Sequence, residues 1–174
     1  TVVHVISSSK FAKKSEEAGC DAVVAEGFEA GGHNGREETT TMVLIPAVVE
    51  AVKIPVIAAG GIANGRQMLA AMVMGAEGVQ LGSRFVASEE ASSHINFKNE
   101  VINSKEGDTK LAMKELTPVR LLKNDFFKEV DEAEKRGATV EELKTLLGKA
   151  RAKKGMFEGN LAEGELEIGQ VSAL

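Results

Sequence analysis

His33 stands in a glycine-rich segment with the sequence EAGGHNG. Imidazole titrates close to neutral pH, so a histidine can take a proton from a substrate under physiological conditions. Glycine lets the backbone approach a ligand closely and adopt positive φ angles. This combination fits a catalytic base held against a bound group. It also fits a loop histidine that bonds a neighbouring carbonyl, and the residues alone leave both interpretations open.

Two further glycine-bearing segments follow apolar runs. Gly60 and Gly61 end the run IPVIAA, and Gly82 and Ser83 follow the run EGVQL. Asn64 is placed to cap the next helix, whose first N–H groups and dipole attract an anion. Backbone N–H groups and a hydroxyl at two successive strand ends predict a phosphate site. The simpler alternative is that these glycines only turn the chain.

The elements that position these residues alternate between strands and helices. The strands are short, continuous, β-branched runs, as expected for strands covered on both faces. Helical patterns separate them, so we predict βα units and a parallel sheet. The predicted strands are 2–7, 21–27, 54–61 and 77–85, and the predicted intervening helices are 10–19, 41–53 and 64–76.

Four strands make half of a TIM barrel, which needs eight strands and about 250 residues. The alternative is a small open doubly wound sheet. In both architectures ligands bind at the carboxyl ends of the strands. The glycine-rich segments all follow predicted strands, so we expect them to meet at one edge of the sheet. The fold class is therefore α/β, with half a barrel as the preferred architecture.

The chain changes texture near its middle, and we expect two regions. Residues 1–87 hold the predicted half-barrel with the ligand-binding loops. Residues 88–174 are richer in Lys and Glu and are predicted to be helical, with an irregular tail. Thr139 and Glu142 have the spacing of a capping box at the start of one of these helices. The charged residues here are most simply a solvated surface.

Composition excludes several classes of protein. The chain has 174 residues, 43% of them hydrophobic, with a net charge of −5 and no basic stripe, so nucleic acid is not an expected partner. Its most apolar window is interrupted by charges and prolines, so we expect no membrane span. A single cysteine, Cys20, fits a reducing compartment, and we expect a cytoplasmic protein. No Cys/His cluster has zinc spacing, so no metal is expected.

The motifs together resemble one enzyme family. EAGGHNG, then IPVIAAGGIANGRQMLAAMVMGAEGVQLGSRF, then AEGELEIGQ near the end are similar to the nitronate monooxygenases, formerly called 2-nitropropane dioxygenases. Their close sister is the flavin-dependent enoyl-acyl-carrier-protein reductase II. Matching segments run along nearly the whole chain. The resemblance implies an FMN-binding TIM barrel, of which this chain would supply the fifth to eighth strands.

The resemblance also implies roles for individual residues. His33 would face the flavin ring and remove the acidic proton of a nitroalkane. The backbone around Ala30 and Gly31 would contact the flavin. The phosphate of FMN would be held by the two strand ends described above, with the residues Gly60, Gly61, Gly82 and Ser83.

Three functions remain open at this point. The first is FMN-dependent oxidation of nitronates or nitroalkanes, and the second is NAD(P)H-dependent enoyl reduction. The third is a non-catalytic barrel that binds a phosphate ligand. The chain starts in a strand pattern, at TVVHVIS, so we expect it to be part of a longer protein. Besides a small-molecule substrate, we expect it to form a homo-oligomer or to associate with the N-terminal half of the barrel.

Overall fold

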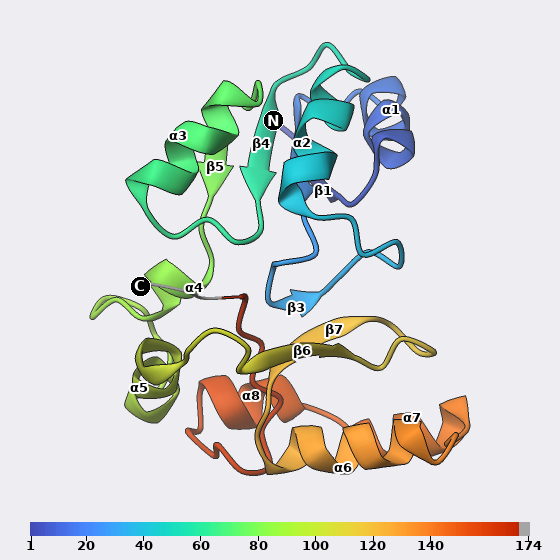
Figure 1. Cartoon of the computed structure of the whole chain (residues 1–174), viewed down its shortest axis with the longest axis vertical. Coiled ribbons are helices and arrows are strands. Elements are labelled where there is room, and N and C mark those ends of the chain that lie inside the picture. The colour runs from blue at the N-terminus through green and yellow to red at the C-terminus, as the bar shows by residue number, and fades with distance from the viewer. Residues whose placement is uncertain (171–174) are drawn as a thin grey trace. The chain divides into compact units, whose positions relative to one another are not determined.

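The computed structural model describes residues 1–170. The chain divides into two compact units, shown in Figure 1. The first unit contains Thr1–Ala30 and Asn34–Gly82. The second unit contains Gly31–His33 together with the chain from Ser83 onward. The histidine segment therefore belongs to the second unit, although it is flanked in sequence by the first.

The first unit is a parallel sheet with three helices. Its strands follow the order β1-β2-β4-β5, and every neighbouring pair is parallel. This arrangement confirms the predicted series of βα units. The strands are β1 (Val3–Ile6), β2 (Ala22–Glu26), β4 (Val56–Ala59) and β5 (Gly78–Gln80), and the helices are α1 (Ser9–Glu17), α2 (Thr41–Val49) and α3 (Gly65–Val73).

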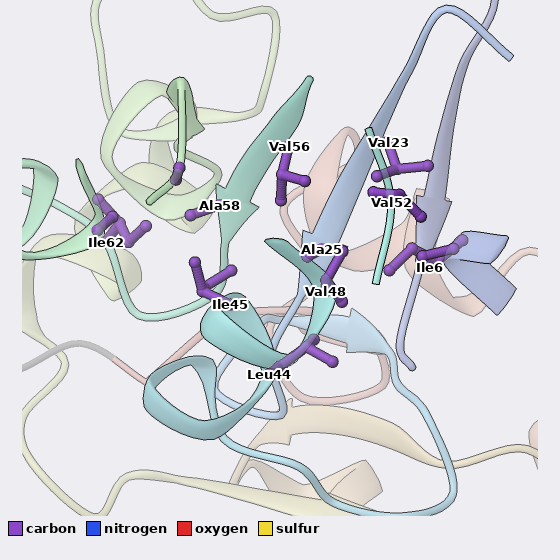
Figure 2. Packing of buried hydrophobic residues seen from close by; sticks show 13 residues of the cluster. Ile6, Val23, Ala25, Leu44, Ile45, Val48, Val52, Val56, Ala58 and Ile62 are labelled. Carbon is purple, nitrogen blue, oxygen red and sulfur yellow. The ribbon is translucent and has the colours of Figure 1, made fainter. Parts of the chain in front are cut away.

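The core of this unit lies between the sheet and its helices (Figure 2). The register places Ile6 opposite Ala25, and Ala25 opposite Ala58, so these side chains share one face of the sheet. Leu44, Ile45 and Val48 of α2 pack against this face. The buried β-branched and small residues of the strands explain why the sequence pattern revealed this sheet.

Helix boundaries in this unit follow from short polar side chains. The hydroxyl of Ser8 accepts a hydrogen bond from the N–H of Phe11 at the start of α1. Asn64 forms a complete capping box with Gln67 at the start of α3. The predicted cap at Asn64 is therefore confirmed, and it fixes where the loop after β4 ends.

The second unit contains helices and a three-stranded antiparallel sheet of order β3-β7-β6. The helices confirm the predicted helical character of this region, but its sheet was not predicted. The elements are β3 (Gly32–His33), α4 (Ser83–Val86), α5 (Ile95–Asn103), β6 (Thr109–Ala112), β7 (Val119–Leu122), α6 (Asp125–Lys135), α7 (Val140–Leu147) and α8 (Arg151–Met156).

The unpredicted strands escape notice because they are short. The sequences of β6 and β7 are TKLA and VRLL, and all four residues of β7 are buried. A buried four-residue run has no alternation of polar and apolar residues, so its period does not distinguish a strand from a helix. The predicted capping box of Thr139 and Glu142, by contrast, is present at the start of α7.

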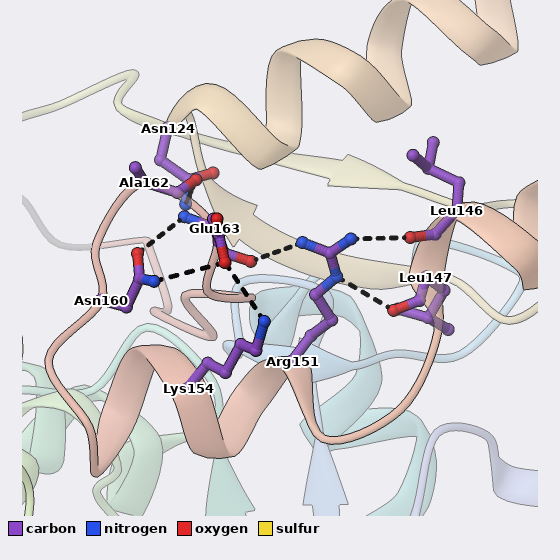
Figure 3. A network of polar contacts seen from close by, with 8 residues as sticks. All are labelled: Asn124, Leu146, Leu147, Arg151, Lys154, Asn160, Ala162 and Glu163. Carbon is purple, nitrogen blue, oxygen red and sulfur yellow. Dashed lines mark hydrogen bonds and ion pairs between the residues drawn. The ribbon is translucent and has the colours of Figure 1, made fainter.

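Arg151 ties the end of α7 to the last part of the described chain (Figure 3). Its guanidinium donates to the carbonyl oxygens of Leu147, Leu146 and Glu163 at 3.1, 3.1 and 2.9 Å. It also stacks over the ring of Phe126, 4.5 Å from the centroid. A planar group with five donors can serve several carbonyls at once, which a lysine cannot. The segment after Glu163 is thereby held against the second unit.

Within residues 1–170, no helix is both long and apolar enough to span a bilayer.

Candidate functional site

The carboxyl edge of the first sheet carries the glycines expected to bind phosphate. Gly60 and Gly61 follow β4 directly and have φ angles of +96° and +68°. These angles favour glycine over every residue with a side chain. Among the described residues, the N–H groups of Gly60, Gly61 and Gly82 have no recorded hydrogen-bond partner. Such amides are suited to an anion.

Thr41 links the loops at this edge through hydrogen bonds. Its N–H donates to the carboxylate of Glu29, 2.9 Å from Oε2. Its hydroxyl oxygen lies 2.9 Å from the same carboxylate oxygen and 2.9 Å from the carbonyl oxygen of Gly60. A Cβ on Gly61 would lie 3.1 Å from the Cβ of Glu29. The loop after β2 and the loop after β4 are therefore held against each other.

The start of α3 contributes less to an anion site than its sequence suggests. The N–H groups of Arg66 and Gln67 both donate to the side-chain oxygen of Asn64. The N–H groups of Ala63 and Asn64 donate to the side-chain oxygen of Gln67. The capping box thus occupies the N–H groups of Ala63, Asn64, Arg66 and Gln67, which are not available to an anion.

Glu26 ends β2 at the same edge. It pairs in register with Ala59, which places it on the face opposite the helix-covered residues Ala25 and Ala58. Burial raises the pKa of Glu26 above its usual range. Sequence analysis did not single it out. The sequence did offer one signal, an acidic residue at the end of an apolar strand, because residues at strand ends carry the chemistry in such folds.

His33 lies on a strand, not in a free loop. Gly32 and His33 form β3, which pairs antiparallel with β7 through Arg120 and Val119. Gly32 is buried with a φ of +78°, and His33 is exposed. The backbone before the histidine is therefore packed, while its side chain is accessible. The glycines before His33 therefore permit close packing of the chain against this backbone.

The tail of the chain is what packs there. A Cβ on Gly31 would lie 2.5 Å from the amide nitrogen of Gly169, and a Cβ on Gly32 would lie 2.9 Å from the Oε2 atom of Glu167. The hydroxyl of Ser83 accepts a hydrogen bond from the N–H of Gly169 at 3.1 Å. The structure thus brings Gly31 and Ser83 to the same amide. The hydroxyl hydrogen of Ser83 is left to donate to an anion.

The expected site residues fall into two groups. Ala30, Gly60, Gly61 and Gly82 belong to the first unit, where they follow three strands at one edge of the sheet. Gly31, His33 and Ser83 belong to the second unit. Sequence spacing does not show that Glu29, Thr41 or Glu167 contacts any of these residues. Those contacts arise only from the fold.

The two other histidines have different surroundings. His4 lies on β1, opposite Val23 and therefore on the helix-covered face of the sheet, and it is exposed. His94 caps α5 by accepting a hydrogen bond from the N–H of Asn96 at 3.1 Å. Within the described part of the chain, no group of three or more His, Cys, Asp or Glu is arranged to hold a metal ion.

Glu165 is a buried acid in the tail, with 9% of its surface exposed. Burial and the nearby charge of Glu167 raise its pKa to about 7, while Arg151 acts in the opposite direction. A carboxyl group whose pKa is raised by folding binds more protons in the folded state. Stability is therefore expected to fall as the pH rises from about 4.5 to about 7, by up to roughly 3 kcal/mol.

Replacing Glu165 by glutamine should remove this dependence. The variant should be more stable than the wild type at pH 8 and should differ much less at pH 4.5. Urea unfolding at the two pH values measures the change, with Glu163→Gln as the matched control, since Glu163 is exposed and its pKa is lowered by Lys154. A destabilised Glu165→Gln variant at pH 8 would show that the carboxylate is needed.

Comparison with known proteins places this architecture. A family model described as nitronate monooxygenase matches residues 1–174. The chain belongs to the nitronate monooxygenase family. A probable nitronate monooxygenase of Staphylococcus saprophyticus is 39% identical over 142 residues, which cover 75% of this chain and 40% of that protein. One from Staphylococcus aureus is 48% identical over 103 residues, covering 55% of this chain and 29% of that protein.

Solved structures give the same result for the fold. FabK from Thermotoga maritima is similar with a TM-score of 0.90 and 41% identity, covering 98% of this chain and 53% of that one. A nitroalkane oxidase from Streptomyces ansochromogenes has a TM-score of 0.77 and 34% identity, covering 98% and 51%. The chain thus spans about half the length of these structures. The four parallel strands of the first unit and the helices that follow them form the C-terminal half of a TIM barrel.

Proposed function

We propose that the protein oxidises nitroalkanes and nitronates with the help of bound FMN. The observation that carries this proposal is the exposed His33, presented by a packed strand in a chain of the nitronate monooxygenase family. The nitroalkane oxidase similarity supports the same class of substrate. The chain covers 40% of the Staphylococcus saprophyticus protein and 51% of the nitroalkane oxidase, so the activity proposed is that of a protein of the relatives' length.

The glycines of the first unit fit the phosphate of FMN. Gly60 and Gly61 turn their backbone through positive φ angles, and their N–H groups have no recorded partner among the described residues. Gly82 adds a further N–H, and Ser83 a hydroxyl hydrogen. We assign these four residues to the phosphate, and the backbone of Ala30 and Gly31 to the flavin ring.

His33 acts on the substrate. A ring nitrogen without a proton takes the proton from the carbon that bears the nitro group, and the C–H electron pair passes into the nitro group to form a nitronate. Proton transfer to a positioned base typically accounts for about 10²–10⁴-fold of the rate. When bound, the flavin supplies the electron acceptor for the nitronate, and oxygen completes the oxidation.

The second candidate is enoyl reduction with NAD(P)H, because FabK of Thermotoga maritima is similar over 98% of this chain. Anaerobic mixing of the flavin-loaded protein with each reductant separates the two functions. Rapid bleaching of the flavin by a nitronate, with slow bleaching by NADH, is expected. Rapid bleaching by NADH with no response to nitronate would replace the proposed function by enoyl reduction.

The strand edges of the half-barrel lead to a proposal about assembly. Val3 and Val5 of β1 are each 47% exposed, and β1 and β5 are the outer strands of the sheet. Outer strands with free N–H and C=O groups pair readily with further strands. We propose that a second copy or the N-terminal half of the barrel covers these edges.

Light scattering on the 174-residue chain tests this assembly. The chain is expected to be a dimer or larger, and to bind FMN weakly when separated from the other half of the barrel. A monodisperse monomer that binds FMN tightly would contradict the need for further strands.

A further inference from the structure

The segment Glu165–Gly169 lies directly against the backbone that precedes His33. Gly31 faces the main chain of this segment, since a Cβ there would lie 2.6 Å from the carbonyl carbon of Ile168 and 2.5 Å from the nitrogen of Gly169. Gly32 faces the carboxylate of Glu167. Because these two successive residues have no side chains, the tail segment can pack directly against their backbone. A side chain at Gly31 would displace the tail segment.

The tail segment is itself firmly anchored in the second unit. Leu166 and Ile168 are 1% and 0% exposed and pack in one cluster with Phe97 and Val101. The N–H of Leu122, at the end of β7, donates to the carbonyl oxygen of Leu166 at 2.9 Å. The strand that pairs with β3 is therefore bonded to the same segment that packs against Gly31 and Gly32.

The strand that carries His33 is short enough to need this support. β3 has two residues and one partner strand, β7. A two-residue ladder closes few hydrogen bonds and opens easily without packing on its other side. Misplacing a catalytic group by about 1 Å can cost about 10²-fold in rate. The packing against Gly31 and Gly32 is thus placed where it would matter most for His33.

We propose that Glu165–Gly169 is the positioning element of His33, and that Ile168 and Gly169 act as positioning residues through Gly31. The inference rests on the proposed function for the role of His33, but the support of β3 by the tail does not depend on it. In this arrangement the tail and β7 fix the backbone of β3, and the imidazole is held in place for the substrate carbon.

Gly31→Ala tests the proposal by adding one methyl group at the point where the tail segment packs. Gly31 has no positive φ angle, so alanine adds a methyl group without backbone strain. In the flavin-loaded protein, turnover of neutral nitroalkane should fall about ten- to a hundredfold. Turnover of pre-formed nitronate, measured per bound flavin in both cases, should change much less, since its proton is already gone. Gly65→Ala is the control, because no atom lies within 4 Å of a Cβ there.

A gentler pair of variants covers the case in which Gly31→Ala does not fold. Ile168→Val and Ile45→Val each remove one methyl group from a fully buried isoleucine, in the second and first unit respectively. Both should lose a similar, small amount of stability in urea unfolding. Only Ile168→Val should lower the ratio of nitroalkane to nitronate turnover. Equal ratios in the two variants would overturn the positioning role.

Hydrogen exchange keeps this test separate from the proposed function. The amides of Gly32, His33 and β7 should exchange faster in Gly31→Ala and Ile168→Val than in their controls. If His33→Asn lowers the turnover of nitroalkane and of nitronate equally, the proposed function fails. Hydrogen exchange at β3 then decides by itself whether the tail segment supports this strand. Unchanged exchange at β3 would overturn the support of this strand by the tail.

Discussion

Replacing His33 by asparagine should lower turnover of neutral nitroalkane by about 10²–10⁴-fold, the usual contribution of a general base. Asparagine keeps hydrogen-bonding atoms but cannot accept the proton. His33 is exposed on β3, and its side chain has no recorded partner among the described residues, so the replacement should leave the packing of Gly31 and Gly32 intact. Flavin content should be unchanged, and turnover of nitronate should fall much less.

The matched control is His4→Asn, the same chemical change at an exposed histidine on β1. It should leave the turnover of both substrate forms near the wild-type values. Equal losses on nitroalkane and nitronate in His33→Asn would show that His33 orients the anion and does not remove a proton.

Replacing Gly61 by valine should expel the flavin. The position has a φ of +68°, and a Cβ would press on the Cβ and Cγ of Glu29 at 3.1 and 3.4 Å. Relief of this contact would move the N–H groups of Gly60 and Gly61 away from the position proposed for the phosphate. Two charge-assisted hydrogen bonds are together worth about 3 kcal/mol or more, so FMN affinity should fall by at least about a hundredfold.

Gly107→Val separates this effect from backbone strain. Gly107 has a φ of +84° with no atom within 4 Å of a Cβ, and it lies in an exposed turn before β6. The variant should lose comparable stability and keep its flavin, as measured by absorbance after gel filtration. Full flavin occupancy in Gly61→Val would contradict the assignment of the phosphate to this loop.

The first sheet could be predicted because each of its strands can be recognised from its own stretch of sequence. Runs such as AVVAE and VIAA are apolar and short, and each is followed by a glycine or a capping residue. The second sheet could not be predicted in this way. Its strand β3 has two residues, and it exists only because β7, more than 80 residues later in the chain, pairs with it.

The site shows the same division. Gly60 and Gly61 could be placed from sequence at a strand end, and their positive φ angles follow from the turn there. The neighbours of Gly31 could not be predicted, because a glycine shows that space is needed and not what fills it. The tail that fills this space begins more than 130 residues later in the sequence.

Removal of a carbon-bound proton by His33 is tested most directly by isotopic substitution. A nitroalkane carrying deuterium on the carbon next to the nitro group should be oxidised more slowly than the ordinary compound by the flavin-loaded protein. The deuterated nitroalkane should show this effect at the low turnover of His33→Asn as well, while pre-formed nitronate, which has lost that proton, should show none. The contradicting result is a wild-type enzyme that oxidises the deuterated and the ordinary nitroalkane equally fast, and both much more slowly than nitronate. The slow step would then not be removal of this proton, and His33 could not act by accelerating that removal.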